Sequence, residues 1–209
     1  FAFPFPATVI CELVGAPPEH RDQFGEWSNE MALVAFSGPD TPGDDRHARA
    51  QRGVESLIAY FDDLIEQRKD TPGDDMISGL LEGDGQGNVL TREEMTGMLT
   101  LVLFAGHETT TNLLSGLVKT LDRHPDQYDL LRRDPDLVPG AVEEMLRYDG
   151  PVKLVVRYVS EDVELGGKTL RRGDRAFLGL AAANRDPEKF AEPDRSFITR
   201  SPNSHLGFG

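Results

Sequence analysis

Cysteine is almost absent from this chain, which contains one, Cys11, among its 209 residues. A single cysteine excludes an internal disulfide framework and a zinc site built from several cysteines. It fits a reducing compartment such as the cytoplasm. Cys11 lies on the apolar face of a helix predicted over residues 7–14, with no His, Lys or second Cys patterned beside it. We therefore interpret Cys11 as a small buried hydrophobic residue without a chemical role.

Positive charge and long apolar runs are also scarce. The chain has 22 Lys and Arg against 36 Asp and Glu, a formal net charge of -14, which argues against nonspecific nucleic-acid binding. Its longest apolar run, residues 101–105, is far shorter than the roughly 20 residues that span a bilayer. The chain also lacks a starting Met and a basic signal sequence, so we expect no membrane association and a natural start upstream of residue 1.

The hydrophobic pattern predicts a mainly α chain with one or two domains. A hydrophobic content of 38% over 209 residues can bury a substantial core. Helical periodicity dominates up to about residue 150, and short alternating segments follow it. Turn residues predict loops at 37–45 and 83–88 and a hairpin turn at Gly166 and Gly167. The predicted helices are residues 7–14, 20–36, 54–65, 76–81, 92–123, 125–133 and 139–148, and the predicted strands are 152–156, 163–165, 168–170 and 175–180.

One long predicted helix contains the most informative stretch. Thr91 and Glu94 have the spacing of a capping box, which places the helix start near residue 92 and its end near 123. The segment before residue 105 is apolar nearly all round, which implies burial, yet Glu108 and three threonines follow. A buried carboxylate is costly unless paired, and a threonine hydroxyl competes for the carbonyl one turn back. Such a departure from local preference indicates a functional or strained site.

The glycine-rich segment 83–88 could be a calcium-binding loop or a nucleotide-binding loop, but its residues match neither motif. A calcium loop starting at Asp84 would need Asp or Asn at 86, Gly at 89 and Glu at 95, where the chain has Gln86, Val89 and Met95. A nucleotide loop would need a preceding strand and a following Gly-Lys-Ser or Gly-Lys-Thr. We interpret the segment as a surface turn.

Two pairs of residues can be interpreted either as ordinary structural residues or as functional ones. His107 and Glu108 could open the H-E-x-x-H motif of a zinc hydrolase, but Thr111 stands where the second histidine ligand belongs. Glu144 and Arg147 are three residues apart and share a helix face. Taken alone, they are best read as an exposed ion pair worth only about 0.5 kcal/mol.

Together, these motifs resemble the cytochrome P-450 family of haem-thiolate monooxygenases, in its soluble bacterial type. Residues 105–110, Ala-Gly-His-Glu-Thr-Thr, resemble the central-helix motif of that family. Glu144 and Arg147 resemble its E-x-x-R motif, and Arg195 in Pro-Asp-Arg resembles the arginine of its meander. Further similarities lie in residues 1–6, 9–15, 184–187 and 157–165.

The resemblance implies a fold that is mainly α, a P-450-like helical body with a small β-sheet region. Residues 1–209 would form the central part of one domain, truncated at both ends. Within it, 1–150 would be helical, 151–180 the small β region and 181–209 a meander leading to the haem loop. The family's cysteine ligand comes several residues after the Phe-Gly that ends this chain. Because the thiolate promotes oxygen–oxygen cleavage, we expect an internal fragment that is inactive alone.

The resemblance also implies the activity and the site. One oxygen atom of O2 would enter an organic, apolar substrate, with electrons from NAD(P)H through a ferredoxin-type donor and its reductase. Glu108 and Thr109 would be the catalytic acid–alcohol pair that relays protons. The remaining expected site residues are the haem contacts Ala105, Gly106, Arg157 and Phe208, a buried structural triad of Glu144, Arg147 and Arg195 that supports the haem loop, and the substrate-facing Leu101, Val102 and Val155.

A non-enzymatic reading stays open beside this one. In it, the chain is a helical scaffold, and the polar residues 108–111 are a satisfied buried patch. That reading predicts no haem pocket beside Gly106.

Overall fold

The computed structural model describes residues 1–35, 43–83 and 89–209. Most of the loop predicted at 37–45 and nearly all of the glycine-rich segment 83–88 lie outside these residues. The chain divides into two compact units, Phe1–Thr111 and Asn112–Gly209. Each unit is described by itself.

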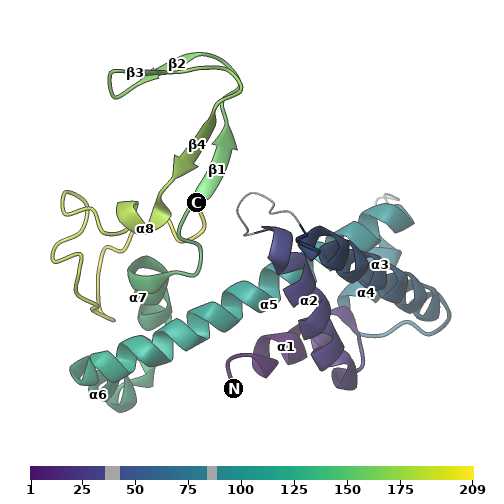
Figure 1. The fold of residues 1–209 in the computed structure, drawn as a ribbon. Helices are drawn as coiled ribbons and strands as arrows, with labels where there is room; N and C mark the ends of the chain where they lie inside the picture. The colour runs from purple at the N-terminus through teal and green to yellow at the C-terminus, as the bar shows by residue number, and fades with distance from the viewer. Residues whose placement is uncertain (36–42, 84–88) are drawn as a thin grey trace. The chain divides into compact units, whose positions relative to one another are not determined.

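The first unit is helical (Figure 1). A short 3-10 turn, η1 (Pro18–His20), separates its first two helices. The predicted helices are present, and the first two begin or end within a few residues of their predicted bounds. The third is longer than predicted, because the apolar spacing covers 54–65 whereas the helix spans Arg46–Asp70. The helices of this unit are α1 (Pro4–Val14), α2 (Arg21–Ala35), α3 (Arg46–Asp70), α4 (Met76–Glu82) and the first part of α5 (Arg92–Arg123).

α1 ends in a glycine cap that also joins it to other helices. Gly15 has φ 82°, its N–H donates to the Glu12 carbonyl at 3.3 Å, and the Ala16 N–H donates to the Cys11 carbonyl at 2.8 Å. These two bonds form a Schellman motif. A Cβ at Gly15 would overlap the carboxylate of Asp75, the N-cap of α4. Glycine is therefore required both by the backbone and by the close approach of α4.

Arg68 of α3 completes this junction. Its Nε donates to Asp75 Oδ2 at 2.6 Å and its Nη2 donates to the Gly15 carbonyl at 2.5 Å. Burial opposes ionisation of Asp75, but the bonds from the Ser78 N–H and from Arg68 outweigh it and lower the pKa of the carboxyl. One guanidinium thus holds the ends of α1, α3 and α4 together.

The core of the first unit lies between α1, α2, α3, α4 and α5. Leu57, Phe61 and Ile65 follow each other at four-residue spacing on α3 and are fully buried. Leu99 and Leu103 of α5 are fully buried in the same cluster. This amphipathic packing is what the spacing predicts.

Cys11 belongs to the same core and is fully buried. Burial raises the pKa of its thiol to about 11. A cysteine in this state is neutral at physiological pH and unreactive. The interpretation of Cys11 as a buried hydrophobic residue is confirmed.

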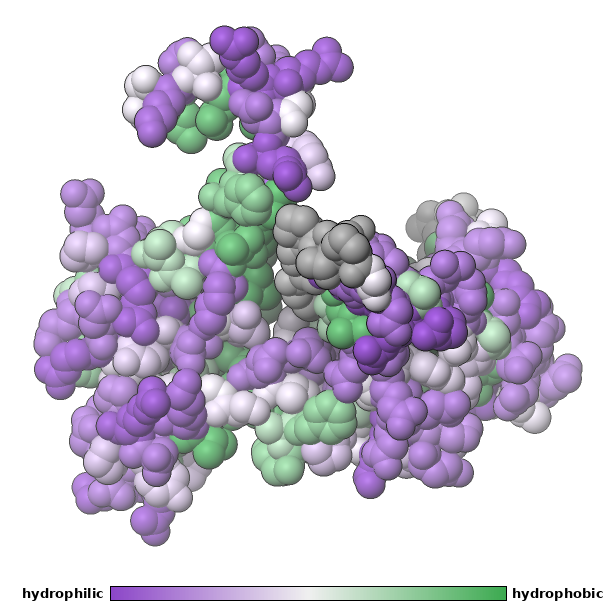
Figure 2. Space-filling view, viewed as in Figure 1, coloured by the Kyte–Doolittle hydropathy of each residue, from purple (hydrophilic) through white to green (hydrophobic). Residues whose placement is uncertain are grey.

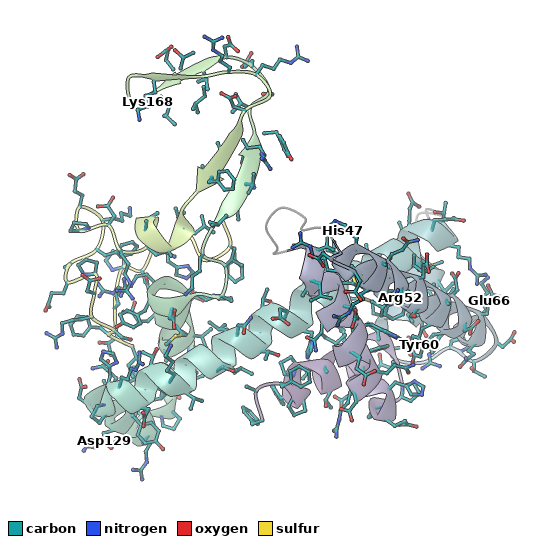
Figure 3. The ribbon with its side chains drawn as sticks, in the orientation of Figure 1. His47, Arg52, Tyr60, Glu66, Asp129 and Lys168 are labelled. Carbon is teal, nitrogen blue, oxygen red and sulfur yellow. The ribbon has the colours of Figure 1, made fainter. Side chains whose placement is uncertain are left out.

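α5 begins at Arg92 and ends at Arg123, as predicted. The capping box is present in both directions: the Glu94 N–H donates to Thr91 Oγ1 at 3.2 Å, and the Thr91 N–H donates to Glu94 Oε2 at 2.8 Å. Arg92 then pairs with Asp62 at 2.7 Å and with Glu66 at 2.5 Å, both on α3, where Figure 3 labels Glu66. The start of α5 is therefore tied to α3.

The second unit combines helices with two small antiparallel pairs of strands. β1 pairs with β4, with Val156 opposite Phe177, and β2 pairs with β3. The turn between β2 and β3 has positive φ at Gly166 and Gly167, as a two-residue hairpin requires. The elements are the end of α5, α6 (Pro125–Arg133), η2 (Pro135–Leu137), α7 (Val138–Asp149), β1 (Val155–Tyr158), β2 (Val163–Leu165), β3 (Lys168–Leu170), β4 (Arg175–Leu178) and α8 (Leu180–Ala183).

β1 differs from its prediction. It spans Val155–Tyr158, where the apolar pattern predicts 152–156. The ladder ends where β4 ends, at Leu178 and not at the predicted residue 180, and beyond it the two segments keep one hydrogen bond, from the Ala181 N–H to the Lys153 carbonyl at 3.1 Å. Figure 2 shows hydrophobic surface along this pair. Phe177 is 64% exposed and Leu178 is 43% exposed.

A sequence of about 20 predominantly apolar residues is needed to cross a bilayer as a helix. Among the residues that the structure describes, every helix is too short or too polar to do so.

The cap of α1 gives a testable prediction. Gly15→Ala should lower the free energy of unfolding of the whole protein by about 1–3 kcal/mol, because alanine is strained at this φ and meets Asp75. Gly79→Ala is the matched control, because Gly79 is exposed inside α4 and a Cβ there meets nothing within 4 Å. It should be neutral or stabilising by up to about 1 kcal/mol. Urea unfolding measures both, and equal effects would contradict the role of the Gly15 cap.

Candidate active site

The polar segment of α5 is regular helix. Thr109 Oγ1 donates to the Ala105 carbonyl at 2.5 Å, one turn back. This bond satisfies the hydroxyl proton inside the helix and tends to bend the helix slightly. A hydroxyl also carries two acceptor positions, so Thr109 can still receive a hydrogen bond.

His107 turns toward the core of the first unit. Its side chain is buried, its Nε2 lies 3.3 Å from the Phe3 carbonyl oxygen, and the Phe3 ring packs edge-on at 4.9 Å. A Cβ built on Gly25 of α2 would lie 3.6 Å from the His107 ring. His107 is thus a packing residue between α5, α2 and the start of α1, which leaves the zinc-hydrolase reading without its first ligand.

Leu101, Ala105 and Glu108 share a face of α5, since they are spaced by four and three residues. Leu101 is 63% exposed, Ala105 is exposed and Glu108 is partly buried. These predicted site residues therefore lie on a more open side of the helix than the buried Leu99 and Leu103. The structure thus places Leu101, Ala105 and Glu108 along one face of α5.

Gly106 lies elsewhere on the helix. A Cβ at this position would come within 3.0 Å of Ile10 Cδ1, on α1. The missing side chain therefore permits close packing of α1 against α5. The role of Ala105 and Gly106 as haem contacts stays a prediction.

An open surface cavity of about 460 Å³ lies in the first unit, lined by residues of α2, α3 and α5. The predicted substrate-facing residues Leu101 and Val102 do not line it. Sequence reasoning missed this cavity because its wall comes from three helices that are distant along the chain. Its lining residues are Met31, Val34, His47, Ala50, Gln51, Val54 and Phe104.

Glu144 and Arg147 form a fully buried ion pair in the second unit. Arg147 Nε donates to Glu144 Oε2 at 2.8 Å, and Nη2 donates to Oε1 at 2.9 Å. The two side chains are 1% exposed or less. The pair is buried, as the family resemblance implies, and the interpretation of the two residues alone as an exposed pair is wrong, because later segments of the chain cover this face of α7.

The third charged member of this cluster is Arg200. Its Nε lies 3.1 Å and 3.2 Å from the two carboxylate oxygens of Glu144, and its side chain is 8% exposed. Arg195, the predicted member, instead pairs with Glu192 at 2.9 Å and is 62% exposed. Arg195 takes part through its carbonyl, which accepts from Arg147 Nη2 at 2.9 Å. The sequence places both arginines in one irregular segment and gives no periodicity to separate them.

Backbone groups extend the cluster. The Phe197 N–H donates to Glu144 Oε1 at 2.8 Å, and the Ile198 N–H donates to Gln127 of α6 at 3.0 Å. A Cβ at Gly140 of α7 would lie 2.6 Å from the Ile198 carbonyl oxygen. The segment around residue 198 is therefore held against α6 and α7 at hydrogen-bond distance.

Arg157 and Phe208 are the remaining predicted haem contacts, and both are exposed. Arg157 lies on β1, and its Nη1 donates to the Val156 carbonyl at 3.1 Å. Phe208 is 86% exposed. An exposed guanidinium can bind a carboxylate through two parallel hydrogen bonds.

Comparison with known proteins decides the family. A sequence model described as "Cytochrome P450" matches residues 32–200. This chain belongs to the cytochrome P-450 family. The P-450 fold is confirmed as well: the crystal structure of P450BioI in complex with hexadec-9Z-enoic acid ligated acyl carrier protein matches with a TM-score of 0.90 and 43% identity. That match covers 100% of this chain and 53% of the other.

Characterised relatives agree with this assignment. Vitamin D(3) 25-hydroxylase of Pseudonocardia autotrophica is 44% identical over 211 residues, which cover all of this chain and 50% of the relative. The biotin biosynthesis cytochrome P450 of Bacillus subtilis (strain 168) is 43% identical over 212 residues, 52% of its length. The chain spans about half the length of the curated relatives it matches.

The buried ion-pair cluster yields a prediction that separates the two arginines. Arg200→Lys in the whole protein should lower the free energy of unfolding by about 1.5–3 kcal/mol, because lysine keeps the charge but loses the guanidinium hydrogen bonds to the buried Glu144. Arg195→Lys should cost less than about 1 kcal/mol, because its ion pair with Glu192 is exposed. Chemical unfolding measures both. A larger loss for Arg195→Lys would restore Arg195 as the charged partner of Glu144.

Proposed function

We propose that the whole protein is a haem-thiolate monooxygenase that inserts one oxygen atom of O2 into an organic, apolar substrate. The match to the cytochrome P-450 family carries this proposal. The names of similar proteins, among them a vitamin D(3) 25-hydroxylase and a 6-deoxyerythronolide B hydroxylase, support it. Both units would belong to one domain, and the near absence of cysteine supports a cytoplasmic location.

The family resemblance supports a haem, and each predicted haem contact has suitable chemistry within its own unit: an exposed Arg157 and Phe208 in the second, and an exposed Ala105 in the first. When bound, the haem supplies the iron centre that activates O2. Arg157 would bind a haem carboxylate, Ala105 would leave space beside α5, and Phe208 would contact the ring. Cys11 does not fit the role of the thiolate ligand, because it is fully buried and its pKa is raised to about 11.

The buried cluster of Glu144, Arg147 and Arg200 would support the haem indirectly. It holds the backbone from residue 193 to 203 against α7. In the family this meander leads to the loop that carries the cysteine ligand. A rigid meander would therefore set the position of the thiolate.

Glu108 and Thr109 would deliver protons. Because the Thr109 proton is held by the Ala105 carbonyl at 2.5 Å, the hydroxyl acts as an acceptor that positions a proton donor. Glu108 is the group that can give a proton and recover it. Electrons would come from NAD(P)H through a ferredoxin-type donor and its reductase.

An apolar substrate would lie beside Leu101, Val102 and Val155. Leu101 is 63% exposed on α5, and Val155 is partly buried on β1. One similar solved structure holds a fatty acyl chain on an acyl carrier protein, which supports an apolar chain as one candidate class.

The Thr109 hydroxyl gives the first functional prediction. Thr109→Val in the whole protein keeps the branched shape and removes the hydroxyl. Product formed per NAD(P)H consumed should fall by at least about tenfold while hydrogen peroxide rises, because the proton donor is no longer positioned. Thr109→Ser keeps the hydroxyl and should retain most of the coupling. Unchanged coupling in Thr109→Val would return Thr109 to a packing role.

The Glu108 carboxyl gives the second functional prediction. Glu108→Gln should slow turnover by about a hundredfold, because an amide cannot exchange a proton. Glu108→Asp retains a carboxyl group and should keep more activity than the amide. Steady-state turnover with a fixed substrate measures both, and a Gln variant as fast as the original enzyme would contradict the relay.

The cofactor itself is tested by absorption spectroscopy. The whole protein, reduced with carbon monoxide present, should give the Soret band typical of thiolate-ligated haem. The 209-residue chain given the same haem should not, because its only cysteine is buried in the core. No haem uptake by the whole protein would favour the scaffold reading, and a thiolate-type band from the short chain would overturn the assignment of the ligand.

A further inference from the structure

The last five residues contain a buried histidine between exposed neighbours. The His205 side chain is 5% exposed, whereas Leu206 is 45% and Phe208 86% exposed. Its ring has a partner at each nitrogen. Nε2 lies 2.8 Å from Glu143 Oε2 on α7, and Nδ1 lies 2.9 Å from the Gly207 nitrogen.

These partners define which nitrogen of His205 carries the proton. The Gly207 N–H can only donate, so Nδ1 must be an unprotonated acceptor. The Glu143 carboxylate accepts, so Nε2 carries the hydrogen. A neutral ring protonated on Nε2 satisfies both bonds, whereas a proton on Nδ1 would face the Gly207 N–H and break that bond.

Gly207 lies so close to His205 and to α7 that a side chain at this position would not fit. A Cβ at Gly207 would lie 2.8 Å from His205 Nδ1 and 3.1 Å from Leu146 Cβ of α7. Any larger residue would push the backbone away from α7 or displace the ring. The backbone at 207 can therefore approach α7 only as glycine.

The backbone amide of Leu206, which precedes Gly207, also has a hydrogen-bond partner. The Leu206 N–H donates to Asn184 Oδ1 at 2.7 Å, and the Asn184 carbonyl accepts from Arg147 Nη1 at 2.8 Å. Asn184 is 3% exposed. Two consecutive amides are thus bound by side chains, one of them through a residue joined to the buried ion pair.

We propose that His205 is a positioning residue, whose unprotonated Nδ1 holds the Gly207 amide and so sets the path of the backbone through Phe208 and Gly209. Its consequence for haem binding rests on the proposed function, under which this segment leads into the haem loop. The bond between Nε2 and Glu143 orients the ring and is secondary, because Glu143 is 56% exposed.

Two substitutions separate the two nitrogens. His205→Asn places an amide oxygen near the position of Nδ1 and can still accept from Gly207, but it does not reach Glu143. His205→Gln places an amide group near Nε2 and can still bind Glu143, but it offers Gly207 no acceptor. Glu143→Gln is the control, because its amide oxygen still accepts from Nε2.

Amide hydrogen exchange of residues 206–209 in the whole protein tests the proposal without haem chemistry. His205→Gln should speed exchange at Gly207 by about three- to tenfold, the range expected for one lost hydrogen bond. His205→Asn and Glu143→Gln should stay close to the original protein. Equal exchange in all variants, or a faster rate only in His205→Asn, would overturn the proposal.

The carbon monoxide spectrum of the same variants tests the consequence. His205→Gln should show a smaller fraction of the thiolate-type Soret band than His205→Asn. If the original protein shows no such band, the proposed function fails while the exchange result still decides the role of His205. If neither variant folds, the ¹⁵N shifts of His205 in the original protein decide instead, and a proton on Nδ1 would overturn the proposal.

Discussion

The buried guanidinium of Arg147 is the constraint on which the second unit depends. Removing two charges from water costs several kcal/mol for each ion, and their attraction compensates only if the remaining donors are satisfied. All five N–H groups of Arg147 have partners: two go to Glu144 and one each to the carbonyls of Asn184, Pro193 and Arg195. Because those carbonyls come from three separate positions, satisfying one side chain fixes the course of an irregular segment.

The two units are therefore stabilised differently. The first unit has a continuous apolar core, in which α3 and α5 bury leucines at helical spacing. The segment after α8 has no long helix or strand, and it buries few large apolar side chains, Phe190 and Ile198 among them. Hydrogen bonds to Glu144, Arg147 and Asn184 define its path instead. A loss of one partner there removes shape as well as stability, because few buried apolar side chains remain to hold the path.

The sequence predicts those features that depend on neighbouring residues. The capping box of Thr91 and Glu94 and the glycine that ends α1 are local signals, and both helix ends lie where these signals place them. Features that depend on distant partners were not predictable. Nothing near Arg195 and Arg200 shows which of them reaches Glu144, and the start of β1 depends on where β4 ends.

The polar residues in the middle of α5 each have different surroundings. His107 packs against Phe3 in the core with its Nε2 near the Phe3 carbonyl, and Thr109 donates its hydroxyl proton to the Ala105 carbonyl. Glu108 lies instead on the same face as the exposed Leu101 and Ala105. A carboxyl group on that face can give and recover a proton, which a hydroxyl already bound to its own helix does poorly. We therefore propose that a proton relay on this helix would depend first on Glu108, with Thr109 as an acceptor.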